Sequence, residues 1–282
     1  MTILLVSVPT FVALTAIAAV CGLVGWFAVL RAQVFAIDAM SHFAFTGAVT
    51  AVAFSIDPRL GVFGLTICCA LLLAALGGRG RVDDVTIGIA VTWVLGLGVL
   101  ALALVARGGT AGSGATAAIA LFGDISGIDT AHAVVATVVA VAVAGALVVI
   151  ARPLVFVSID PGVARSRGLP VAMLGLAFFV LLGGVAAEAT QVVGALLLIG
   201  LVSAPAGAAH RLSSRPYRGM SLAVGIAVGS AWLGLWISAE WPTIAPSSAI
   251  VGVAALVFAA AVLPDRRRAR REVLDGVVPG RR

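Results

Sequence analysis

Long apolar runs, separated by short breaks that carry charge, glycine or proline, dominate the pattern along this chain. Each run is close to the length of about 20 apolar residues that an α-helix needs to cross a bilayer. The pattern predicts about nine transmembrane helices in one bundle, with a tight turn near 188–191 between the sixth and the seventh. Their expected ranges are 3–30, 34–56, 60–77, 85–106, 131–151, 171–190, 191–210, 219–238 and 247–263.

Composition supports a membrane protein rather than a globular one. Of the 282 residues, 62% are hydrophobic and 11% are charged, whereas a soluble domain carries about 25% charged residues. This small number of polar groups cannot cover a surface that faces water. Lipid must therefore surround most of the chain. We expect an all-α polytopic membrane protein with a transmembrane domain over 1–263 and a flexible, basic cytoplasmic tail over 264–282.

The positive charges predict the orientation in the membrane. All 18 basic residues are arginines, and they lie in the breaks between apolar runs or in the tail. Cytoplasmic loops of membrane proteins are enriched in arginine and lysine. With the tail in the cytoplasm, 16 of the 18 arginines fall inside, and only Arg59 and Arg107 fall outside. This distribution predicts nine spans with the N-terminus outside and the C-terminus inside, and it argues for membrane topology rather than nucleic-acid binding.

Asp38 and His42 are two ionisable residues inside the second apolar run. Their spacing of four places them on one face of a helix. Ionisable groups in lipid are costly and normally face the bundle interior or a water-filled path. A carboxylate and an imidazole suit a borderline divalent ion such as zinc or manganese. The residues alone leave three interpretations open: a metal path, a hydrogen bond that joins two helices, and a proton relay.

Three further ionisable residues lie at the predicted span ends. Glu188, near the outer end of the sixth span, is a candidate outer metal ligand or gate, or a cap for the tight turn that follows. His132 lies at the outer mouth of the fifth span and His210 at the cytoplasmic end of the seventh. For these two histidines an interfacial position is the simpler interpretation. The three cysteines lie in apolar runs and are expected to be packing residues.

A short cytoplasmic helix is predicted over 161–167, between the fifth and sixth spans. Asp160 suits the N-cap and Pro161 the first helical position. Gly168 suits the left-handed residue that ends a helix, and Pro170 prevents its continuation. Two turns are not stable alone in water. The helix therefore packs either on its own bundle or on a cytoplasmic partner.

Five stretches closely resemble the membrane permeases of the zinc/manganese class of ABC importers, in the family's order. The resemblance extends from about residue 22 to residue 262. The matching stretches are DAMSHFAFTG (38–47), DDVTIGI (83–89), ALFGDIS (120–126), SIDPGVARSRGLPV (158–171) and QVVGALLLIGLVSAPAGAAHRL (191–212).

The resemblance implies a transport subunit of the bacterial inner membrane rather than an enzyme. Its implied partners are a second copy of the chain, a cytoplasmic ABC ATPase and an external metal-binding protein. The implied cargo is a divalent transition metal, with no permanently bound cofactor. Asp38 and His42 are implied to line the ion path. The segment implied to couple to the ATPase contains the candidate residues Asp160, Pro161, Ala164, Arg165 and Gly168.

The chain departs from the family pattern at three places. It has Thr46–Gly47 where the family often has proline before glycine, and WPTIAPSSA where a Pro-x-Gly is common. Glu188 is not part of the family pattern. These departures leave zinc, manganese and iron(II) open as cargo.

Two other functional classes fit the sequence less well. An intramembrane enzyme needs a nucleophile–base pair or a motif such as HExxH, and no HExxH occurs. A secondary transporter shows broken helices in two related halves, and no such halves are evident. Neither class accounts for the five matching stretches.

The predicted orientation is testable by thiol labelling. A cysteine introduced into 264–282, in a chain without its native cysteines, should react only with membrane-permeant reagents. A cysteine introduced into 108–118 should react with impermeant reagents as well. The measurement is labelling of intact cells, and the opposite pattern would reverse every inside and outside assignment.

Overall fold

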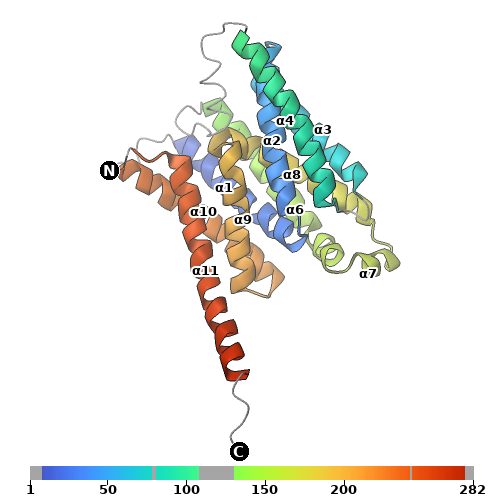
Figure 1. Ribbon diagram of the computed structural model, residues 1–282, viewed down its shortest axis with the longest axis vertical. Coiled ribbons are helices and arrows are strands. Elements are labelled where there is room, and N and C mark those ends of the chain that lie inside the picture. The colour runs from blue at the N-terminus through green and yellow to red at the C-terminus, as the bar shows by residue number, and fades with distance from the viewer. Residues whose placement is uncertain (1–7, 78–80, 108–129, 242, 277–282) are drawn as a thin grey trace, which may run out of the picture.

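The computed structural model describes residues 8–77, 81–107, 130–241 and 243–276, and this part of the chain is entirely helical outside its turns (Figure 1). It contains nine long helices and one short helix, α7. The helices are α1 (Val8–Leu30), α2 (Val34–Ala53), α3 (Pro58–Leu76), α4 (Asp84–Arg107), α6 (Thr130–Ile159), α7 (Pro161–Ser166), α8 (Val171–Val193), α9 (Ala195–Leu212), α10 (Pro216–Glu240) and α11 (Pro246–Gly276).

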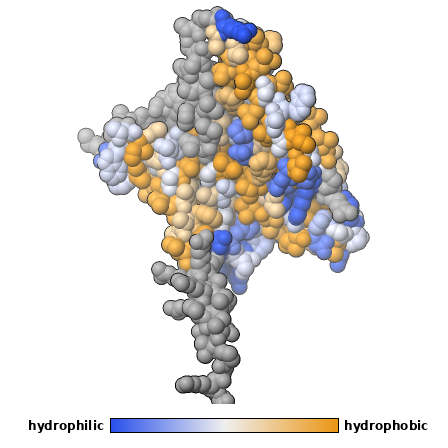
Figure 2. All heavy atoms as spheres, in the orientation of Figure 1, coloured by the Kyte–Doolittle hydropathy of each residue, from blue (hydrophilic) through white to orange (hydrophobic). Residues whose placement is uncertain are grey.

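The bundle has a buried centre and an apolar exterior. α1, α2 and α8 are buried over most of their lengths, whereas α3, α4, α6, α10 and the 246–263 part of α11 are buried over a third of theirs or less. The exposed side chains of the outer helices are largely Val, Leu, Ile and Trp. Figure 2 shows apolar atoms over much of the visible flank, with hydrophilic ones gathered at the lower right, where Figure 1 places α7. This distribution is the one that lipid requires.

Small residues let the central helices approach closely. A Cβ atom placed on Gly25 of α1 would lie 2.1 Å from the carbonyl oxygen of Val202 in α9. Gly47 of α2 and Gly61 of α3 face each other in the same way, each 2.3 Å by this measure from the other's carbonyl oxygen. Lipid tails are as apolar as leucine, so helices in a membrane are held together by such close packing.

The predicted helix ranges agree with the structure except at particular ends. α6 does not stop at residue 151 but continues through Pro153 to Ile159. α8 continues through 188–191, so the break falls at Gly194, with φ 93° and ψ 154°. Glu188 therefore lies inside a helix and does not cap the turn, which corrects that alternative. The predicted tail begins as a continuation of α11 (Figure 1).

Length and hydropathy identify eight membrane-spanning candidates among the described helices, and α9 is not one of them. The chain is thus an all-helical membrane protein, while the nine-span count and the orientation stay predictions. The stretch 108–129, with its matching segment at 120–126, lies outside the described residues, as does 277–282.

The Gly25 contact gives a stability prediction. Gly25→Ala should lower the free energy of unfolding by about 1–3 kcal/mol, because the new methyl group meets backbone that cannot move aside. Gly145→Ala in α6 is the matched control, since a Cβ there meets nothing within 4 Å. Thermal unfolding of the purified protein in detergent measures both. Equal melting temperatures for the two variants would contradict the close approach of α1 and α9.

Candidate functional site

Asp38 and His42 lie on one face of α2, as their spacing predicts. His42 Nε2 is 3.6 Å from Asp38 Oδ2, which is too long for a hydrogen bond. Their side chains are 20% exposed for His42 and 31% for Asp38, whereas most of α2 is buried. Asp38 lies about one turn inside the start of α2. The pair thus combines a carboxylate and an imidazole that are both partly accessible from outside the chain.

The same face of α2 is closed further along the helix. Phe45 and Val49 follow His42 at helical spacing, and both are buried. They pack in one apolar cluster with Ala101 of α4 and Ala195, the first residue of α9. On the predicted topology this cluster lies on the outer side of the pair. An ion at Asp38 and His42 is therefore separated from the outer surface by apolar side chains.

The two side chains are not part of a larger ligand set in one protomer. No group of three or more His, Cys, Asp or Glu residues that could hold a metal occurs among the described residues. Two ligands suit a transport site, which must release its cargo. They also leave coordination positions for groups supplied from elsewhere.

Glu188 is not grouped with this pair. Its side chain is buried in α8, and its Oε1 lies 3.6 Å from Nη2 of Arg59 at the start of α3. The neighbouring Ala187 packs with Ala44, Ala48 and Val62. Within this cluster, Ala44 and Ala48 belong to α2 and lie on a different face of that helix from His42. Sequence reasoning identified Glu188 as unusual but missed Arg59, whose outside position against the positive-inside rule was the available signal.

Of the two histidines at helix ends, His210 has a packing role, whereas the side chain of His132 is exposed. His210 stacks on Trp26, with ring centroids 4.9 Å apart, and its Nε2 lies 3.0 Å from the Trp26 carbonyl oxygen. The backbone carbonyl of His132 accepts a hydrogen bond from Arg59 Nη2 at 3.5 Å. Cys21 and Cys69 are buried and Cys68 is exposed on the outside of α3. These positions favour the interfacial and packing interpretations.

The short helix α7 forms as predicted. The Asp160 carboxylate accepts from the backbone amides of Gly162 and Val163, both at 2.9 Å, and Gly168 has a φ of 77°. Ala164 is fully buried in the main core, so it holds the helix on the bundle. Arg165 is exposed. The helix therefore packs on its own bundle, as one of the two alternatives predicts, and docking of its exposed face on a partner stays a prediction.

A polar network that the sequence did not reveal lies beside α7. Arg31, between α1 and α2, is buried, and its Nη1 donates to Ser158 Oγ at 3.3 Å. The Arg31 guanidinium also lies over the Phe178 ring, 4.9 Å from its centroid. Arg81 donates to the Ser158 carbonyl oxygen. Burial, with a smaller contribution from Arg81, lowers the pKa of Arg31 to about 10.

Gln33 extends this network to the start of α2. Its side-chain amide donates to the Val82 carbonyl oxygen at 2.8 Å, and its Oε1 accepts from the Val82 amide at 3.4 Å. Gln33, the residue before α2, is thus hydrogen-bonded to the connection between α3 and α4. Arg81 of the same connection donates to the carbonyl oxygen of Ser158 at the end of α6. A polar pocket of about 450 Å³ opens at these residues. Hydrogen bonds therefore link the end of α6, which precedes α7, to the start of the helix that carries Asp38.

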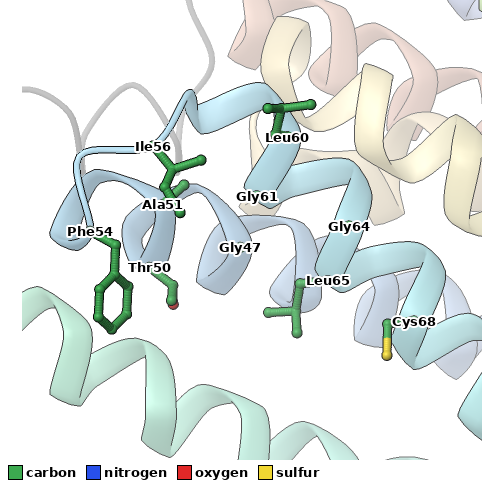
Figure 3. Close-up of a pocket in the computed structure, with 10 residues that line it drawn as sticks. All are labelled: Gly47, Thr50, Ala51, Phe54, Ile56, Leu60, Gly61, Gly64, Leu65 and Cys68. Atoms are coloured by element: carbon green, nitrogen blue, oxygen red, sulfur yellow. The ribbon is translucent and has the colours of Figure 1, made fainter.

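An apolar groove between α2 and α3 is not part of the site. Its volume is about 340 Å³, and none of the candidate metal residues lines it. Figure 3 shows Gly47, Gly61 and Gly64 on the two helices, with Thr50, Phe54 and Leu65 around them. The groove arises where glycines bring the two backbones together.

Several known proteins with similar sequences are named as membrane components of manganese transport systems. The chain is 29% identical to the manganese transport system membrane protein MntC of Halalkalibacterium halodurans over 243 residues, 86% of this chain and 81% of that protein. It is 25% identical to the manganese import system permease protein ScaB of Streptococcus gordonii over 260 residues, 91% of each.

Solved structures share the fold. PsaBC from Streptococcus pneumoniae, in complex with a Fab, contains a chain with a TM-score of 0.76 and 25% identity, covering 89% of both chains. An inward-facing putative metal-chelate type ABC transporter matches with a TM-score of 0.68 at 16% identity, over 92% of this chain and 87% of that one. Residues 5–264 match the profile of the ABC 3 transport family. Because that match covers nearly the whole chain, the protein belongs to the ABC 3 transport family.

Proposed function

We infer that this chain is the permease subunit of an ATP-driven importer that moves a divalent transition metal into the cytoplasm of a bacterium. The family match over residues 5–264 carries this inference. The protein is a multi-pass membrane protein and a transport subunit, and in such systems ATP is hydrolysed on a separate chain. Manganese is the first cargo to test, because the similar proteins are named for it, and zinc and iron(II) are the alternatives.

We propose that Asp38 and His42 are cargo ligands. The pair is partly exposed on an otherwise buried helix, and a carboxylate with an imidazole suits Mn²⁺, Zn²⁺ and Fe²⁺ alike. The exposed face gives a second copy of the chain a place to pack. Two copies with these faces opposed would bring two aspartates and two histidines to one path. A homodimer would thus complete a ligand set that one protomer lacks.

We propose that α7 docks on the cytoplasmic ATPase. Its exposed face includes Val163, which is 44% exposed, and Arg165. Ala164 on the opposite face fixes the helix to the bundle, and Asp160, Pro161 and Gly168 define its ends. The Arg31 and Gln33 network then offers a mechanical route from α7 to α2. An external metal-binding protein would deliver cargo at the opposite end.

Neither alternative class is favoured by a described feature. A secondary transporter would place its coupling-ion site between two related halves, and α1, α2 and α8 instead form one shared centre. An intramembrane enzyme is not supported by the family match over residues 5–264.

The ligand role predicts a loss of transport without a loss of protein. Asp38→Asn keeps the side-chain shape and removes the charge, and His42→Gln replaces a good ligand by a poor one. Uptake of ⁵⁴Mn²⁺ should fall at least about tenfold in each, equivalent to about 1.4 kcal/mol of lost interaction. Uptake is normalised to the amount of assembled complex in the membrane. Competition of unlabelled Zn²⁺ and Fe²⁺ with ⁵⁴Mn²⁺ for uptake tests which ion is the cargo.

The same variants separate a ligand from a structural role. If the pair only joins helices, Asn and Gln can still form hydrogen bonds and uptake should be near normal. Near-normal uptake in both variants would remove the metal path from this face. Ser41→Ala, which changes a buried neighbour on α2, is the control for disturbance of the helix itself.

The docking role of α7 predicts uncoupling by charge reversal. Arg165→Glu changes only the exposed face, so the permease should accumulate normally while metal-dependent ATPase activity and uptake both fall severalfold. Arg215→Glu, an equally exposed change on the predicted cytoplasmic side, is the matched control. Co-purification of the ATPase with each variant is measured together with its activity. Equal binding and activity in both variants would place the docking surface elsewhere.

A further inference from the structure

Arg59 and Glu188 form a buried ion pair at the predicted outer end of the bundle. The Glu188 side chain is 4% exposed and that of Arg59 21%. Arg59 is the second residue of α3, and Glu188 lies five residues before the end of α8. Because Arg59 Nη2 also donates to the His132 carbonyl oxygen in α6, one guanidinium connects three helices.

This pair is incompletely bonded. Glu188 Oε1 and Arg59 Nε have no hydrogen-bond partner among the described residues, and the buried hydroxyl of Thr190 has none either. At 3.6 Å the contact between the charges is electrostatic rather than a hydrogen bond. A buried ion pair offsets its desolvation only when its geometry and hydrogen bonds are good. The pair therefore connects α3 and α8, but its net attraction is weak enough that the two helix ends can separate at a small cost in free energy.

A single residue, Gly194, connects α8 to α9, six residues after Glu188 in the chain. Gly194 has φ 93° and ψ 154°, a region of backbone space essentially restricted to glycine. α9 begins at the next residue, Ala195, with no intervening loop. The two helices can therefore change their relative angle only through the backbone of this residue and its neighbours, which makes Gly194 a hinge.

Ala195, on the far side of this hinge, closes the face of α2 that carries the metal pair. It belongs to one apolar cluster with Phe45 and Val49, which continue the line of Asp38 and His42 toward the predicted outer end. Glu188 and Ala195 therefore lie on opposite sides of Gly194, one held by Arg59 and the other sealing the path. A movement of the end of α8 would therefore change both the contact of Glu188 with Arg59 and the position of Ala195.

We propose that Arg59 and Glu188 form the latch of an outer gate, whose seal is the apolar contact of Ala195 with Phe45 and Val49. When the latch opens, the end of α8 leaves α3, and the hinge carries Ala195 off the seal. Water that enters the open mouth hydrates the separated charges and so offsets the lost attraction. Two arrangements of similar free energy result, as a transport switch requires. The proposal rests on the proposed function, because it assumes an ion path past Asp38.

A buried reporter cysteine tests the latch. Val49→Cys is placed in the full-length chain without native cysteines, together with its ATPase in native membranes. Its modification by a membrane-impermeant cationic methanethiosulfonate from outside is timed. Arg59→Gln and Glu188→Gln should each speed modification roughly tenfold, by raising the fraction of open gates. Arg107→Gln removes the same charge from the same predicted side at an exposed position, and it should leave the rate unchanged.

The charge-exchanged variant, Arg59→Glu with Glu188→Arg, decides between a latch and a merely structural pair. It should return modification to the slow rate of the parent chain, and it also serves if a single variant fails to accumulate. Fast modification in the exchanged chain would overturn the proposal, as would unchanged rates in both single variants. Loss of metal uptake in Glu188→Gln with normal uptake in Arg59→Gln would assign Glu188 to the cargo instead. Because thiol modification requires no metal, these results are independent of the uptake assay at Asp38 and His42.

Discussion

The hydrocarbon interior of a bilayer offers no hydrogen bonds, and the rest of the structure follows from this constraint. Every backbone group within it must be paired inside the protein, so the spanning segments are helices. Every ionisable side chain must find a partner, water or a functional reason to be there. Few such side chains occur in the described spans. Asp38 with His42, and Glu188 with Arg59, are both located on buried central helices or at their contacts.

Much of the fold was predictable from sequence because apolar length and helix punctuation are local properties. Nine apolar runs correspond to the nine long helices, and the residues that cap α7 act as their chemistry predicts. The errors concern positions where local signals conflict. The fifth span was expected to end at residue 151, but α6 continues through Pro153 to Ile159. The apolar character of α8 and α9 is continuous, so only the backbone angle of Gly194 reveals their boundary.

The candidate site was predictable only as far as spacing along one helix determines it. Asp38 and His42 share a face because they are four residues apart, and no tertiary information is needed. The partners of Glu188 and Arg31 lie 129 and 127 residues away in the chain, and no periodicity links such positions. The burial of Ala164 likewise depends on how α7 seats against the bundle.

The length of α6 sets where the ATPase would meet this protein. At about 1.5 Å per residue, its 30 residues extend roughly 45 Å, whereas the hydrocarbon layer is about 30 Å thick. The helix is thus longer than the hydrocarbon layer, and α7 begins at Pro161, just after its predicted cytoplasmic end. With its headgroups a bilayer is about 40–45 Å thick, so a protein partner would meet α7 at the level of the lipid headgroups. Force applied at α7 would reach α6 through the single extended residue Asp160 rather than through a long flexible connection.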